Sequence, residues 1–118
     1  MGSPSLNGTA NMLEYGGFQD AIAASYGGDK VKKAEEYRKR SPELSPAKFT
    51  MPVAFAVGGK DAVVPPDSVR RLAAQLTRQN AKNVLLIERE TGGHATNYDD
   101  ALACLEFMLA PSKIQKAE

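Results

Sequence analysis

The chain has 118 residues, of which 42% are hydrophobic and 25% are charged, and its 15 Lys and Arg against 14 Asp and Glu leave a net charge of +1. This balance lacks the excess of positive charge that is typical of nucleic-acid-binding proteins. No apolar run approaches the roughly 20 residues that span a bilayer. One cysteine and one histidine exclude an internal disulfide and a Cys/His zinc site, and they favour a reducing, cytoplasmic compartment.

The length predicts one domain that covers the whole chain, residues 1–118. Residues 1–50 are expected to form its helical and irregular lead-in. Within them, residues 19–24 favour a short helix that Gly27-Gly28 ends. Asp29 is a suitable N-cap for a second helix over residues 30–40. That helix is mostly charged, so we expect it on the surface, with its few apolar positions at Val31, Ala34 and Tyr37.

Residues 51–110 are predicted to form a βαβα core. Residues 53–57 are a continuous apolar run, typical of a buried strand in a parallel sheet, and residues 84–87 predict a second buried strand. Between them, Asp67 or Ser68 is the expected cap of a helix. The apolar stripe of this helix consists of Val69, Leu72, Ala73 and Leu76. Strand, helix and strand at this spacing indicate an α/β fold.

A last helix is predicted over residues 98–109. It carries three leucines on one face, and two aspartates lie near its positive end. These residues are Leu102, Leu105, Leu109, Asp99 and Asp100.

Two loops follow the predicted strands and are the candidate sites of chemistry. The first strand leads into Gly58-Gly59-Lys60-Asp61, and the second leads into Gly92-Gly93-His94. Ligands bind at the carboxyl ends of parallel strands, and neighbouring strands lie about 4.8 Å apart, so the two loops can meet. Asp61 and His94 are therefore a candidate carboxylate–imidazole pair for general base catalysis. We expect the preceding glycines to provide positive φ angles at the loop tips.

The same residues resemble the α/β-hydrolase superfamily. The sequence Gly58-Gly59-Lys60-Asp61-Ala62-Val63-Val64-Pro65 resembles its acid loop, G-x-x-D-x-x-V-P, and Thr91-Gly92-Gly93-His94 resembles its histidine loop. The acid precedes the histidine, as in the family. Upstream, residues 26–28 and 36–42 are similar to the segment before the acid strand in prolyl-oligopeptidase-like hydrolases. The resemblance implies that Asp61 is the acid and His94 the base of a catalytic triad.

The third member of such a triad, a serine in a G-x-S-x-G elbow, has no counterpart in this sequence. The closest segment contains Ser25, but no buried strand precedes it, and it lies only 36 residues before Asp61. We therefore expect Ser25 to be a helix-end residue. Cys104 lies within the predicted last helix, where a buried hydrophobe is the better interpretation than a nucleophile.

Two further features are interpreted as structural. Glutamates at helical spacing interrupt a basic cluster, which indicates a solvated helix with ion pairs. The cluster consists of Lys30, Lys32, Lys33, Arg38, Lys39 and Arg40. The paired glycines lack the pattern of a phosphate-binding loop, so no cofactor is expected.

The resemblance implies a three-layer αβα arrangement with about three parallel strands, the carboxy-terminal portion of a serine peptidase or esterase. The first of these strands would lie around residues 5–8, and its outer edge would lack a partner. Such an edge predicts a homodimer or higher oligomer, through the edge itself or by exchange of the amino-terminal segment. The missing amino-terminal half is a further candidate partner. The alternative function is a non-catalytic α/β interaction or scaffold domain with hydrolase-like loops.

Overall fold

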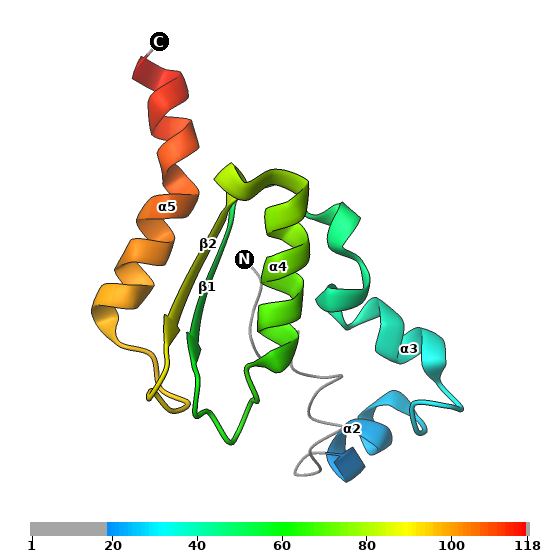
Figure 1. Ribbon diagram of the computed structural model, residues 1–118. Helices are drawn as coiled ribbons and strands as arrows, with labels where there is room; N and C mark the ends of the chain where they lie inside the picture. The colour runs from blue at the N-terminus through cyan, green and yellow to red at the C-terminus, as the bar shows by residue number, and fades with distance from the viewer. Residues whose placement is uncertain (1–18, 118) are drawn as a thin grey trace.

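The computed structural model describes residues 19–117, and it describes side-chain surroundings for residues 20–110. Four helices and two strands make up this part of the chain, together with three short 3-10 turns (Figure 1). In chain order they are α2 (Gln19–Tyr26), α3 (Ala34–Lys39), η1 (Pro42–Leu44), η2 (Pro46–Lys48), β1 (Val53–Gly58), α4 (Asp67–Asn80), η3 (Ala81–Asn83), β2 (Val84–Arg89) and α5 (Tyr98–Ala117).

The two strands form a parallel sheet. The register runs from Val53 opposite Val84 to Gly58 opposite Arg89, and α4 connects the strands, so the predicted βαβ unit and the α/β class are confirmed. Figure 1 shows the strands between α4 and α5. The third strand that was expected around residues 5–8 lies outside the described residues.

The core lies between β1 and α4. Alternate residues of β1 point toward α4, because successive side chains of a strand face opposite sides of the sheet. The predicted stripe of α4 meets them, since its spacing places its members on one helix face. The resulting buried cluster consists of Val53, Phe55, Val57, Val69, Leu72, Ala73 and Leu76. The predicted cap of α4 was wrong: the N-cap residue is Pro66, and Asp67 is already the first helical residue.

The prediction that the second strand, β2, is buried was wrong. Leu86 is exposed, and Val84, Leu85 and Ile87 are only partly buried. The reason lies in the position of α5, which packs mainly against β1 and covers β2 less. β2 is therefore flanked by β1 on one side only within the described residues.

The lead-in packs beside α4 through the turns η1 and η2. The first helix ends before Gly27, as expected, where φ is +84°. The second helix is shorter than predicted, Ala34–Lys39, because Asp29 caps a preceding turn instead, accepting hydrogen bonds from the N–H groups of Val31 and Lys32. Val31 does not belong to a buried face. Tyr37 does, and its hydroxyl donates to the carbonyl of Gly28 at 2.8 Å.

The last helix, α5, extends beyond the predicted end at residue 109. Cys104 faces inward, as expected, and is 9% exposed. The three leucines share a face, but this face is open to solvent, with Leu102, Leu105 and Leu109 each more than one third exposed. Within residues 19–117, no helix has the length and apolar character needed to cross a bilayer.

Candidate functional site

The two candidate residues meet at the carboxyl ends of β1 and β2. Nδ1 of His94 lies 3.0 Å from Oδ2 of Asp61, a hydrogen-bond distance. The two side chains differ in exposure: the Asp61 side chain is 11% exposed, whereas that of His94 is 58% exposed. The carboxylate is thus a nearly buried support, and the imidazole extends from it toward solvent.

The loop that follows β1 fixes the orientation of Asp61. Its other carboxylate oxygen, Oδ1, accepts hydrogen bonds from the N–H groups of Val63 and Val64, both at 2.9 Å. An aspartate that bonds the backbone two and three residues later closes a local turn. Asp61 therefore has one oxygen held by its own loop and the other directed at the imidazole.

Close contact between the two loop backbones brings the pair together. The N–H of Gly59 donates to the carbonyl of Arg89 at 2.8 Å, and the N–H of Lys60 donates to the carbonyl of Gly92 at 2.9 Å. Positive φ does not explain the glycines here, contrary to expectation, since Gly27 is the only described residue with positive φ. Space explains Gly58: a Cβ there would lie 2.5 Å from the carbonyl oxygen of Gly92.

An ion pair that the sequence did not reveal frames the histidine loop. Arg89, the last residue of β2, binds both oxygens of Asp100 at the start of α5, at 3.0 and 2.5 Å. Asn97 accepts a hydrogen bond from the N–H of Asp100 at 2.8 Å and so caps α5. The spacing of Asn97 and Asp100, three residues apart at the start of a helix, is the signal that could have predicted this cap.

Hydrogen bonding determines the ionisation of both carboxylates. Partial burial acts to raise the pKa of Asp61, but hydrogen bonds from Val64, His94 and Val63 together outweigh it and lower the pKa below the ordinary value. For Asp100, the hydrogen bonds from Arg89 lower the pKa against the opposing effect of burial. Both groups are therefore carboxylates at neutral pH.

The lowered pKa of Asp61 predicts a pH dependence of stability. Because the folded state binds this proton less tightly than the unfolded chain, the contribution of Asp61 is complete above the unfolded pKa of about 4. It is lost as the pH falls below that value through the folded pKa. We expect the free energy of unfolding of Asp61→Asn to fall less steeply below about pH 4 than that of the wild type. Urea titrations from pH 7 to pH 2 measure this difference, and parallel curves for the two proteins would contradict it.

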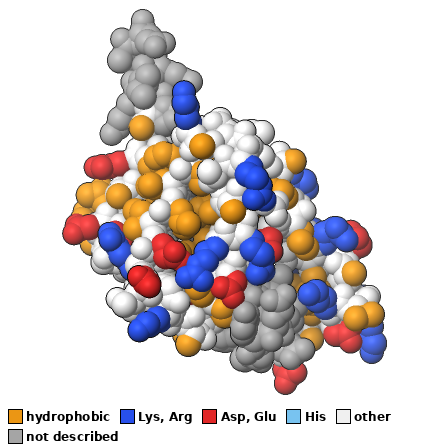
Figure 2. All heavy atoms as spheres, viewed as in Figure 1, with side chains coloured by type: hydrophobic (Ala, Val, Ile, Leu, Met, Phe, Trp, Pro, Cys, Tyr) orange, Lys and Arg blue, Asp and Glu red, His pale blue; other side chains and the backbone are white. Residues whose placement is uncertain are grey.

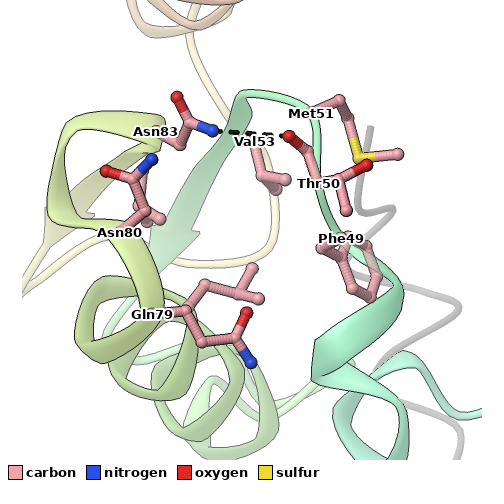
Figure 3. A pocket seen from close by; sticks show the side chains of 9 residues that line it. Phe49, Thr50, Met51, Val53, Gln79, Asn80 and Asn83 are labelled. Carbon is pink, nitrogen blue, oxygen red and sulfur yellow. Dashed lines mark hydrogen bonds between the residues drawn. The ribbon is translucent and has the colours of Figure 1, made fainter.

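Two hollows lie near the ends of the sheet. One, of about 410 Å³, lies beside the histidine loop and is lined in part by Thr91, Thr96 and Asn97, but its lining does not include Asp61 or His94. The other, of about 230 Å³, lies at the amino ends of the strands (Figure 3). There Asn83 donates to the carbonyl of Thr50 at 3.4 Å. This second hollow is at the opposite end of the sheet from Asp61 and His94.

The other residues considered as candidates are buried or engaged in local contacts that explain them without a catalytic role. Ser25 lies in α2, where its hydroxyl donates to the carbonyl of Ala21 one turn earlier at 2.9 Å. Burial raises the pKa of the Cys104 thiol, which disfavours the nucleophilic thiolate. In the basic cluster, Glu36 pairs with Lys39 and Arg40. Among the described residues, no group of three or more His, Cys, Asp and Glu could hold a metal ion.

Comparison with known proteins does not extend these observations. No family model, curated protein or solved structure matches the chain.

Proposed function

We propose that this chain is the carboxy-terminal portion of a serine hydrolase, a peptidase or esterase of the prolyl-oligopeptidase-like α/β-hydrolases. The observation that carries the proposal is the 3.0 Å contact between Asp61 and His94 at the ends of neighbouring parallel strands. The position of the strands between α4 and α5 (Figure 1) supports a three-layer αβα arrangement. The third parallel strand belongs to this proposal. So does a cytoplasmic location, which is supported by a single cysteine, Cys104, that forms no disulfide within the chain.

The hydrogen bond between Asp61 and His94 has the direction that acyl transfer requires. An ionised Asp61 can only accept a hydrogen bond, so Nδ1 of His94 carries the proton, and Nε2 is left with its lone pair. Nε2 can then take the proton of an attacking serine hydroxyl and later give it to the leaving group. Asp61 stabilises the imidazolium that forms between these steps.

The nucleophile and the oxyanion donors must come from elsewhere under this proposal. Ser25 is engaged within its own helix, and no hydrogen bond joins a serine to His94 among the described residues. We therefore expect the 118-residue chain to be inactive by itself. A segment that carries a G-x-S-x-G elbow would have to supply the serine, either in the same polypeptide or as a partner.

Fluorophosphonate labelling tests the proposal. The coding sequence that precedes the codon of Met1 is read first, and the extended product is expressed and treated with the probe. We expect an upstream G-x-S-x-G serine to be labelled, at a rate that falls about a thousandfold or more in His94→Ala. Asp99→Asn is a matched control, because Asp99 is an exposed acidic residue outside the pair, and its labelling rate should equal that of the wild type.

Other outcomes of the same experiment would contradict the assignment. Labelling of the 118-residue chain that disappears in Ser25→Ala would make Ser25 the nucleophile. The absence of an upstream elbow, together with no labelling, would contradict the hydrolase proposal. It would favour the second candidate function, a non-catalytic α/β interaction domain, for which the exposed leucine face of α5 is the supporting observation.

A further inference from the structure

The outer edge of β2 is open within the described residues. β2 pairs with β1 on one side, and no described strand lies on the other. The carbonyl of Arg89 is directed at β1, where it accepts from Gly59. Because the main-chain groups of a strand alternate in direction, those of Leu86 and Glu88 are directed at the open edge. Unpaired main-chain groups of this kind are a template for another strand.

Apolar side chains accompany this edge. The two charged residues of β2, Glu88 and Arg89, form ion pairs with Arg70 and Asp100. β2 contains no proline and no irregularity in its register with β1, two of the devices that commonly block strand edges. Leu86, at the centre of the strand, is 38% exposed, and the leucine face of α5 is exposed as well. Figure 2 shows hydrophobic side chains gathered over α5 and along its border with β2. Leu86 is opposite Phe55 in the register, so it lies on the face of the sheet that α4 covers, whereas α5 lies on the other face. Pairing of β2 with a second strand would bury Leu86 and favour association.

The charged residues that flank β2 have opposite signs at its two ends, so they would be complementary to those of a second β2 that runs antiparallel to it. Lys82 lies just before β2 and Glu90 just after it, and both are exposed. Neither side chain has an ion-pair partner among the described residues. If two copies of β2 pair antiparallel about a twofold axis at Leu86, Lys82 of each copy, in the turn η3 just before the strand, comes to the same end of the interface as Glu90 of the other. A twofold interface requires such self-complementarity.

We propose that the chain forms a homodimer by antiparallel pairing of β2 with β2 of a second copy, which joins the two sheets into one of four strands. Leu86 lies on the twofold axis, and the two Lys82–Glu90 pairs close the ends of the interface. Both α5 helices then lie on the same face of the joined sheet. This interface uses a different edge from the one the sequence predicted, and it is independent of Asp61 and His94.

Charge reversal tests both the partner and the orientation. In Lys82→Glu, each dimer would contain two glutamate–glutamate contacts, and in Glu90→Lys it would contain two lysine–lysine contacts. We expect each variant alone to dimerise about tenfold more weakly than the wild type, because two exposed pairs are reversed at once. An equimolar mixture of the two variants restores both attractive pairs in a heterodimer. Analytical ultracentrifugation at low salt measures the dissociation constants.

The hydrophobic centre of the interface provides a second measurement. Leu86→Lys should be monomeric at concentrations where the wild type is a dimer, whereas Leu44→Lys, at a similarly exposed leucine on η1, should dimerise normally. Circular dichroism establishes that each variant is folded. A wild type that stays monomeric at millimolar concentration would overturn the proposal. A dimer that is insensitive to Leu86→Lys, or a mixture of charge variants no tighter than either alone, would overturn it too.

Discussion

Gly58→Ala should destabilise the protein by roughly 2–4 kcal/mol and separate Asp61 from His94. The added Cβ would lie 2.5 Å from the carbonyl oxygen of Gly92 and closer still to that of Gly93. Both obstacles are backbone atoms, so they move only if the histidine loop is displaced from the acid loop. Urea denaturation measures the loss of stability. The ring signals of the single histidine report the loss of the contact by nuclear magnetic resonance.

Gly93→Ala is the matched control for this prediction. It changes the same residue type in the loop that Gly58 faces, but no atom beyond the adjacent residues of the chain lies within 4 Å of the position its Cβ would take. The φ angle of Gly93 is not positive, so alanine is tolerated there. We expect a change within about 1 kcal/mol, in the stabilising direction if the loss of unfolded-state entropy dominates. Equal effects at Gly58 and Gly93 would show that close backbone packing does not explain Gly58.

Leu72→Ala should cost about 2–5 kcal/mol, because it removes a fully buried side chain from the centre of the cluster between α4 and β1. A domain of this size has only about 5–15 kcal/mol of total stability, so the variant is expected to lose a large share of it and to unfold at a lower temperature than the wild type. Thermal denaturation followed by circular dichroism measures the change.

The exposed Leu44 provides the comparison for Leu72. Leu44→Ala removes the same atoms from a side chain that is 51% exposed, and we expect a change within about 0.5 kcal/mol. If the two variants were equally stable, the cluster around Leu72 would not be the core of the protein.

Helices and strands could be predicted from the sequence where their apolar residues followed a single clear spacing. The apolar run of residues 53–57 and the stripe of α4 gave β1 and its covering helix nearly at their observed bounds. The helix after Asp29 was predicted too long, because a local side-chain bond at Asp29 competes with the helix and makes a turn instead. The burial of β2 was also predicted wrongly, since an apolar strand has the same sequence pattern whether or not a neighbouring helix covers it.

The candidate site, too, could be predicted from the sequence only in part. The order of loops and strands by itself places Asp61 and His94 at one edge of a parallel sheet, because the residues that follow each strand gather at this edge. The sequence did not reveal what supports them. The Arg89–Asp100 ion pair joins residues 11 positions apart across a loop, and nothing in the spacing specifies that they meet.

By itself, then, the sequence determined the α/β class, the βαβ unit and the identity of the carboxylate–imidazole pair, because each follows from chain order and short-range periodicity. Only the tertiary structure decided why Gly58 must lack a side chain, which nitrogen of His94 faces Asp61, and how far α5 covers β2. These features depend on contacts between segments about 30 residues apart. Such contacts are set by how the elements pack, and no local pattern encodes them.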